Sequence, residues 1–148
     1  PMREVTSLEI ADQMVVDVEL PDGTNLRVVN VHMFGPQPDD AGVWYDGLRT
    51  LDGALEKFDG PWVAIGDFNA TFDHRSYRDL LGSGRRDAHL DTGRGAARSW
   101  PAGSMVPALA LIDHAIMSPG LRAQSTSEHT ISGTDHRMIT VDLAILPA

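Results

Sequence analysis

The stretch Trp62-Val63-Ala64-Ile65-Gly66-Asp67-Phe68-Asn69 decides the fold and points to the site. Its first four residues form a short, continuous apolar run, which is typical of a strand covered on both sides. The polar side chains of Asp67 and Asn69 follow at once, where the strand gives way to a loop. Rigid strands hold loop residues in place for binding and catalysis, so this junction predicts a site at one edge of a sheet.

Three more apolar runs end in polar groups of the same kind. The motifs are Asn30-Val31-His32, Ile112-Asp113-His114 and Thr134-Asp135-His136. One such motif means little, because polar residues are common at strand ends. Four of them, in order along one chain, predict an active site built from the groups that phosphoester chemistry uses.

Apolar periodicity predicts the remaining elements. Strands are expected at residues 14–20, 26–31, 62–65, 109–117 and 138–145, and helices at residues 43–58 and 73–81. The first two strands form a hairpin across the turn at residues 21–25, and Asp73 is the expected N-cap of the second helix. This order predicts an α+β fold with a mixed, mostly antiparallel β-sheet and flanking helices.

Composition limits the kind of protein. The 148 residues are enough for a single domain with a real core. A formal net charge of -9 argues against a nucleic-acid binder that relies on a broad basic surface. The 21 acidic residues fit the binding of Mg²⁺, Mn²⁺ or Ca²⁺, which prefer oxygen ligands. There is no cysteine, so thiolate metal sites and a cysteine nucleophile are excluded.

Asp113 lies inside an apolar run, where a carboxylate costs several kcal/mol unless it is paired. His136 is the best candidate partner, because an Asp–His pair fixes the imidazole tautomer and raises its basicity. Asp135 and His136 point in opposite directions if the chain is extended there. Asp135 then faces a metal while His136 faces the phosphate.

Each motif also has a structural interpretation. Asp67 and Asn69 fit a turn whose side chains bond their own backbone, and His32 fits a half-exposed histidine at a strand end. In the functional interpretation, Asp67 is a general base or orients the attacking water. The amide of Asn69 then donates to the phosphoryl oxygens.

The other histidines receive structural predictions. His74, His89 and His129 show no mutual metal-ligand spacing and are expected at the surface. His114 follows Asp113 in a strand, so it should point to the opposite face and serve a structural role.

A basic segment follows the second predicted helix. Arg85, Arg86, Arg94 and Arg98 precede Trp100. They fit a substrate loop that contacts phosphate and stacks on a base or sugar, and they fit equally a solvated loop anchored by one tryptophan.

Together the motifs resemble the endonuclease/exonuclease/phosphatase superfamily, which includes DNase I-like nucleases, neutral sphingomyelinases and inositol polyphosphate 5-phosphatases. The resemblance covers residues 14–145 and rests on the ordered set of four motifs. Two further segments, Arg86-Asp87-Ala88 and Ser99-Trp100-Pro101, are also family-like. The family fold implies that the sheet is part of a four-layer α/β/β/α sandwich.

The resemblance implies catalytic roles for several of these residues. His136, oriented by Asp113, would act at the phosphate. Asp67 would activate water or assist the leaving group, and Asn69 would stabilise the transition state. Mg²⁺ or Mn²⁺ would neutralise charge during in-line attack of water on a phosphoester.

The resemblance also implies contacts around this centre. Asp135 would be a metal ligand, and His32 a second histidine on the phosphate. Asn30, Arg98 and Trp100 would bind substrate. The phosphoester belongs to a nucleic acid, a phospholipid or a small molecule, and the acidic composition slightly favours the last two.

One departure from the family pattern matters. Family members have an earlier Asn and a principal metal-binding Glu, usually within a Gln-Glu pair, and neither place is filled here. The chain therefore resembles the C-terminal part of the domain, with weakened metal binding. We expect a missing N-terminal part or self-association to cover an apolar sheet face. The alternative is a non-catalytic remnant or phosphate-binding module. Some relatives are membrane-tethered with an extracytoplasmic catalytic domain.

Overall fold

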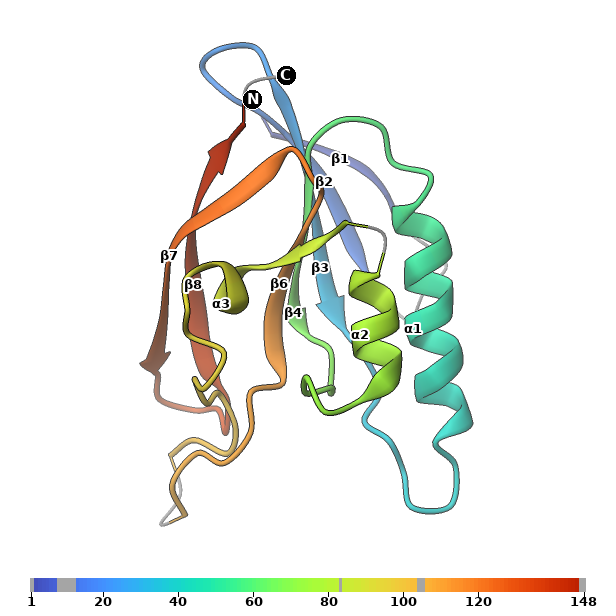
Figure 1. Cartoon of the computed structure of the whole chain (residues 1–148), viewed down its shortest axis with the longest axis vertical. Coiled ribbons are helices and arrows are strands. Elements are labelled where there is room, and N and C mark those ends of the chain that lie inside the picture. The colour runs from blue at the N-terminus through green and yellow to red at the C-terminus, as the bar shows by residue number, and fades with distance from the viewer. Residues whose placement is uncertain (1, 8–12, 83, 104–105, 147–148) are drawn as a thin grey trace.

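The computed structural model describes residues 2–7, 13–82, 84–103 and 106–146 (Figure 1). The elements, in chain order, are β1 (Met2–Ser7), β2 (Met14–Glu19), β3 (Asn25–His32), α1 (Gly42–Leu55), β4 (Trp62–Asp67), α2 (Arg75–Leu81), β5 (Arg86–Asp87), α3 (Ala88–Asp91), β6 (Asp113–Met117), β7 (Leu121–Thr130) and β8 (Arg137–Ile145). Among the described residues, no helix has the length and apolar character that crossing a bilayer requires.

Six strands form the main sheet in the order β1-β2-β3-β4-β6-β5. Only β3 and β4 run parallel; α1 provides the crossover between them, and the other neighbours are antiparallel. Strands β7 and β8 form a separate antiparallel pair. The predicted α+β fold with a mixed, mostly antiparallel sheet is confirmed.

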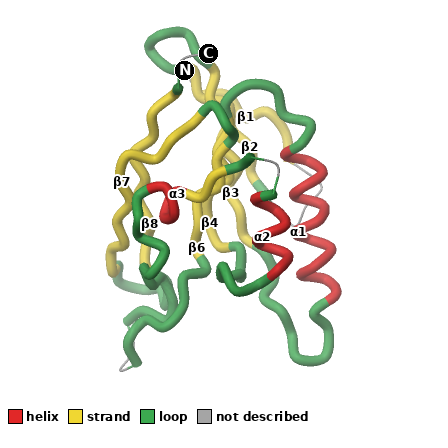
Figure 2. Tube along the Cα trace, in the orientation of Figure 1, coloured by secondary structure: helices red, strands yellow, loops and turns green. Residues whose placement is uncertain are grey.

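The two faces of the main sheet bury different apolar clusters (Figures 1 and 2). Helices α1 and α2 cover one face, where Val29, Ala64 and Ile116 pack against residues such as Leu48 and Leu51. The β7–β8 hairpin covers part of the other face. The cluster there contains Val63, Ala88, Ala115, Met117, Leu121 and Ala123. Alternation along each strand sends neighbouring side chains into opposite clusters.

Three predicted boundaries are wrong. The helix expected at residues 43–58 ends at Leu55. The strand expected at residues 109–117 starts only at Asp113, because Leu109 and Ala110 donate their backbone N–H groups to Trp100 O instead of to the sheet. The second helix starts at Arg75, with His74 as N-cap, so Asp73 is not the cap. The imidazole of His74 accepts a bond from the Thr71 backbone N–H, which closes the loop before α2.

Glycine is required where β3 and β4 approach each other. Gly66 has a φ of +141°, and a Cβ built there would lie 2.0 Å from the Val31 carbonyl oxygen. Any side chain would therefore push the strands apart. Gly66 thus fixes the spacing of the two parallel strands directly before Asp67.

Candidate active site

Three polar residues line up across the carboxyl edge of the sheet. In the strand register, His32 on β3 is the partner of Asp67 on β4, and Asp67 is the partner of Asp113 on β6. Ile65 and Ala115, two positions away on the same strands, belong to the apolar cluster under the β7–β8 hairpin. Asp67 and Asp113 consequently point to that same face.

His136 completes the row from the loop that leads into β8. Its Nδ1 donates to Oδ2 of Asp113 at 3.0 Å. The Asp113 residue is only 8% exposed, whereas the His136 side chain is 28% exposed and reaches solvent. The pairing predicted from the sequence is therefore present, with the carboxylate buried behind an accessible imidazole.

The electrostatics of His136 follow from this pairing. Burial lowers the pKa of His136, but the hydrogen bond with Asp113 and the charges of Asp113, Asp67 and Asp135 outweigh it and raise that pKa above its ordinary value of 6.5. A carboxylate partner stabilises the imidazolium form. His136 is thus placed to hold a proton beside an anionic group.

The pKa of Asp67 is also raised, and here burial is the largest cause. Burial raises the pKa of Asp67, and the nearby Asp113 carboxylate adds to that rise. The Asn69 backbone N–H and the histidines His136 and His32 lower it without cancelling the effect. Two carboxylates at neighbouring register positions repel each other, which a bound cation would relieve.

Asn69 lies in the left-handed region with φ 47° and folds back on Asp67. Its backbone N–H donates to Asp67 Oδ1 at 2.7 Å, as the structural interpretation of this turn expected. Its amide Nδ2 donates to Asp67 Oδ2 at 3.0 Å and to Met33 O at 2.8 Å. Both amide hydrogens are therefore occupied, and Asn69 holds the Asp67 carboxylate in one orientation.

Three described groups in this row offer metal-binding atoms close together. One ligand atom each from Asp67, Asp113 and His136 lies within 4.8 Å of the others. Two carboxylates and an imidazole fit Mg²⁺ or Mn²⁺, which bind oxygen-rich sites. Asp135 lies outside this group, and its role as a metal ligand stays a prediction.

Asp135 and Trp100 form the outer rim of the site. Trp100 Nε1 donates to Asp135 Oδ2 at 3.1 Å, and this bond lowers the pKa of Asp135. Trp100 as a whole residue is 39% exposed. Arg98 is exposed nearby with its guanidinium on the carbonyls of Ala96 and Ala97.

Asn30 lies two residues before His32 on β3, and both are exposed. Strand alternation therefore places the Asn30 side chain on the same face of the sheet as His32 and Asp67. This face carries the row of His32, Asp67 and Asp113, and the substrate-binding role of Asn30 stays a prediction.

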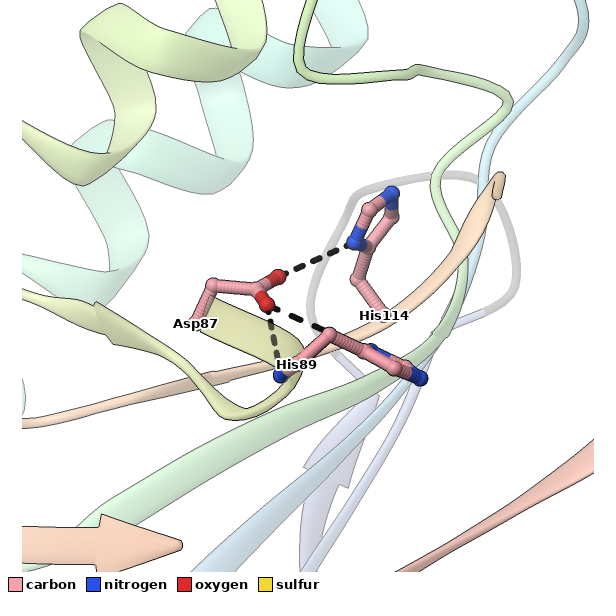
Figure 3. A group of neighbouring side chains, drawn as sticks. All are labelled: Asp87, His89 and His114. Atoms are coloured by element: carbon pink, nitrogen blue, oxygen red, sulfur yellow. Dashed lines mark hydrogen bonds and ion pairs between the residues drawn. The ribbon is translucent and has the colours of Figure 1, made fainter. Parts of the chain in front are cut away.

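A second Asp–His cluster lies on the helix side of the sheet (Figure 3). Asp87, His89 and His114 also bring potential ligand atoms within 4.8 Å of one another, and all three are buried. His114 Nδ1 bonds Asp87 Oδ2 at 2.9 Å, and its Nε2 bonds the Ala70 carbonyl at 2.9 Å. The predicted structural role of His114 on the opposite face agrees with these contacts.

Both oxygens of the Asp87 carboxylate in this second cluster accept hydrogen bonds from donors within the protein. Oδ1 accepts from the backbone N–H groups of His89 and Leu90, and Oδ2 accepts from Tyr77 at 2.6 Å as well as from His114. Burial raises the pKa of Asp87, but the bonds with His114 and Tyr77 outweigh it and lower that pKa. Asp87 therefore caps α3 and ties it to α2 and β6.

The surface prediction for His89 is wrong. His89 is fully buried, and its Nε2 contacts Glu128 Oε1 at 3.2 Å. Burial lowers the pKa of His89. Its position follows from the cap at Asp87, because α3 turns the His89 ring inward toward β7.

Most of the basic segment serves the fold. Arg85 is buried on Asp52 and the Leu80 carbonyl. Arg86 pairs with Asp91 at 2.7 Å, and Arg94 pairs with Glu128. These three arginines have protein partners, which leaves Arg98 as the member of the segment placed beside the candidate site.

Two supporting residues were given no role in the sequence analysis. Ser99 is fully buried, and its Oγ accepts from the backbone N–H groups of Ile112 and Asp113. Gln13 bonds both the N–H and the C=O of His32, each at 2.9 Å. The Ser99-Trp100-Pro101 motif pointed to Ser99. Gln13 could not be found in this way, because its contact with His32 joins residues far apart in the sequence and has no local pattern.

The chain matches the Endonuclease/Exonuclease/phosphatase family over residues 4–136. That match covers most of the chain, so the protein belongs to this family. No curated protein sequence is significantly similar to the chain.

Solved structures share the fold at low sequence identity. A functionally unknown conserved protein from Enterococcus faecalis V583 is 19% identical with a TM-score of 0.70, over 90% of this chain and 55% of that one. A mannosyl-6-phosphatase from Bacteroides thetaiotaomicron is 17% identical with a TM-score of 0.68, over 90% of this chain and 57% of that one. D. rerio TDP2 in complex with a single-strand DNA product is 13% identical with a TM-score of 0.73, over 97% of this chain and 67% of that one. The chain thus spans little more than half of the first two.

Proposed function

We propose that this chain carries the catalytic edge of a metal-dependent phosphoesterase, which hydrolyses a phosphodiester or phosphomonoester by in-line attack of water. The observation that carries the proposal is the row of His32, Asp67 and Asp113 in strand register, with His136 bonded to Asp113. The family supports phosphoester hydrolysis as the reaction class.

In this proposal His136 contacts the phosphate as the proton-holding group. Asp113 fixes its tautomer and stabilises its charged form at 3.0 Å. His32 supplies a second imidazole on the same edge of the sheet. Hydrogen-bond donors placed before the reaction starts stabilise charge that develops on the phosphoryl oxygens.

Asp67 orients or deprotonates the attacking water. Burial and the nearby Asp113 raise the pKa of Asp67, which makes its carboxylate a stronger base than a free one. Because the Asn69 amide donates both of its hydrogens, to Met33 O and to Asp67 Oδ2, we assign Asn69 as a positioning residue for that base.

Asp67 and Asp113 would hold Mg²⁺ or Mn²⁺, with His136 beside them and Asp135 as a further candidate ligand. When bound, the ion supplies charge neutralisation at the phosphate. Trp100, Arg98 and Asn30 surround this centre and would bind the rest of the substrate.

We further propose that the chain is the C-terminal part of the family domain, within a four-layer α/β/β/α sandwich. The observed α1–α2 layer, main sheet and β7–β8 pair correspond to part of that arrangement. The chain covers 55% and 57% of two of the matched structures, which supports its assignment as part of a longer domain. An N-terminal part or a second copy would cover the remaining apolar sheet face.

Hydrolysis assays test the proposal. We expect release of p-nitrophenol from bis(p-nitrophenyl) phosphate or p-nitrophenyl phosphate in Mg²⁺ or Mn²⁺, and loss of that activity in His136→Ala. His129→Ala is the matched control, because His129 is an exposed histidine on β7. Equal rates in wild type and His136→Ala would refute the assignment. Tight binding of phosphate without hydrolysis would favour the phosphate-binding module instead.

A further inference from the structure

One buried serine bonds the backbone at both ends of the Asp113–His136 pair. Asp113 begins β6, whereas His136 lies in the loop that leads into β8, so the two partners come from separate parts of the chain. Ser99 lies in the loop between α3 and β6 and is fully buried. Its hydrogen bonds connect these two parts of the chain.

The hydroxyl of Ser99 holds the Asp113 end of the pair. Ser99 Oγ accepts from the backbone N–H of Asp113 at 3.2 Å and from that of Ile112 at 3.1 Å. The Ser99 backbone N–H donates to Ala110 O at 2.8 Å. These bonds help to fix the start of β6, and the Asp113 carboxylate projects from that point.

The backbone of the same segment holds the His136 end. The N–H of Arg137, directly after His136, donates to Ser99 O at 2.8 Å. The N–H of Ala102 donates to the carbonyl of Asp135, directly before His136, at 2.6 Å. Bonds to residues 99 and 102 therefore hold the chain on both sides of His136.

Ser118 makes a comparable set of bonds at the other end of β6. It is buried, its Oγ accepts from the Trp62 backbone N–H at 3.0 Å, and its own N–H donates to Trp62 O at 3.0 Å. Its carbonyl accepts from the Leu121 N–H at 3.0 Å. Both serines satisfy buried backbone groups, as a structural role requires. The difference is that the Ser99 bonds end at Asp113 and beside His136.

We propose that Ser99 is a positioning residue, which sets the geometry of the Asp113–His136 pair through its hydroxyl on one side and its carbonyl on the other. Because Ser99 is fully buried, it acts through the pair and not on the substrate. Catalytic groups must be held to within about 0.5 Å of the productive geometry. The kinetic consequence of this inference rests on the proposed function, whereas the geometry of the pair does not.

Serine substitutions test this role. Ser99→Ala leaves the backbone N–H of Asp113 without its Oγ acceptor. Ser118→Ala is the matched control, because it removes a buried hydroxyl from a backbone N–H at the far end of β6. Ser99→Cys is a second variant, which fills nearly the same space with a weak acceptor and replaces Ser99→Ala if the alanine variant does not fold. Circular dichroism and melting temperature establish which variants fold.

The first readout is the tautomer of His136, measured in EDTA above its raised pKa, where the ring is neutral. Nitrogen-15 shifts of labelled histidines, correlated with the ring C–H protons, identify the nitrogen that carries the proton, and His136→Ala assigns the signals. We expect the wild type and Ser118→Ala to hold the proton on Nδ1, which faces Asp113. The Ser99 variants should show a mixture with the Nε2–H form, because the pair is no longer fixed.

The second readout is hydrolysis of bis(p-nitrophenyl) phosphate in Mn²⁺. Ser99→Ala should lower kcat about tenfold or more, as the loss of a contact that orients a catalytic group typically does. KM should change little, because the buried hydroxyl does not touch the substrate. Ser118→Ala should keep the kcat of the wild type.

Three results would overturn the inference. They are a wild type whose neutral His136 carries its proton on Nε2, a folded Ser99 variant that keeps the tautomer or the kcat of an active wild type, and a Ser118→Ala protein that changes the tautomer as much as Ser99→Ala. The expected tautomers without hydrolysis by any of the proteins would refute the proposed function alone. Hydrolysis by all of them with unchanged tautomers would refute the positioning role of Ser99 alone.

Discussion

Asp113 and His114 are neighbours on β6 that face opposite sides of the main sheet, and each belongs to its own Asp–His pair. Asp113 bonds His136 at 3.0 Å under the β7–β8 hairpin, at the exposed edge. His114 bonds Asp87 at 2.9 Å on the helix side and is completely buried. Both are Asp–His pairs, but they differ in burial and in the number of protein donors that bond the carboxylate.

The first prediction contrasts the histidines of these pairs. His114→Ala leaves the Asp87 carboxylate buried without one of its donors, which costs about 3–5 kcal/mol. We expect a large fall in the free energy of unfolding, measured by urea denaturation. His136→Ala should cost less stability than His114→Ala, because the His136–Asp113 pair lies at the partly exposed edge, and it should abolish hydrolysis.

The opposite pattern would contradict this division. If His114→Ala folded with unchanged stability while His136→Ala unfolded the protein, the buried pair would not hold the fold. His129→Ala serves as the control for both measurements.

The second prediction concerns the pKa of His136. An NMR titration of its ring protons should give a value above 6.5, because the hydrogen bond with Asp113 and the surrounding carboxylates outweigh burial. Asp113→Asn removes the main cause and should lower the pKa. An unchanged pKa in Asp113→Asn would show that the pair does not set the charge of His136.

The same shift has a consequence for stability. The folded protein holds the His136 proton more tightly than the unfolded chain does, so this contribution is complete below pH 6.5 and is lost as the pH rises through the raised value. We therefore expect the wild type to have a higher urea midpoint than Asp113→Asn at pH 6.5 and below. The difference between the two midpoints should shrink as the pH rises through the raised pKa of His136. A constant difference between the two proteins would argue against the linkage.

The third prediction concerns Gly66. A Cβ there meets the Val31 carbonyl at 2.0 Å, so Gly66→Ala forces β3 away from β4. We expect a loss of about 3 kcal/mol or more in the free energy of unfolding. Gly53→Ala is the matched control. A Cβ at Gly53 meets nothing within 4 Å, so alanine should stabilise α1 by about 0.5–1 kcal/mol. Equal effects at the two glycines would contradict the close approach.

The fourth prediction tests Asn69 as a positioning residue. Asn69→Ala frees the Asp67 carboxylate from its amide donor and should lower kcat about 10- to 100-fold. KM should change little, because the amide hydrogens are bonded within the protein. Asn25→Ala, at the exposed start of β3, is the control. A rise in KM with unchanged kcat would instead assign Asn69 to substrate binding.

Local patterns in the sequence predicted two of the three strands that carry the row, β3 and β4, and the elements next to them. Alternation predicted β2, the apolar run after the turn predicted β3, helical spacing predicted α1, and the apolar run from Trp62 predicted β4. The pairing of Asp113 with His136 also followed from the sequence, because a carboxylate inside an apolar run needs a partner.

Long-range contacts account for what local patterns missed. Residues 109–112 look like a strand but pair with the backbone of Trp100. His89 looks like a surface residue, but it is fully buried and its ring contacts Glu128 on β7. Neither partner lies within the segment concerned, so periodicity carried no signal for them.

The measurement that tests the account most directly is hydrolysis of bis(p-nitrophenyl) phosphate by the wild-type chain and by Asp67→Ala, each in Mn²⁺ and in EDTA. The account predicts Mn²⁺-dependent release of p-nitrophenol by the wild type and none by Asp67→Ala or in EDTA. Hydrolysis that persists in EDTA, or that Asp67→Ala retains, would contradict a metal-dependent site built on the His32, Asp67 and Asp113 row.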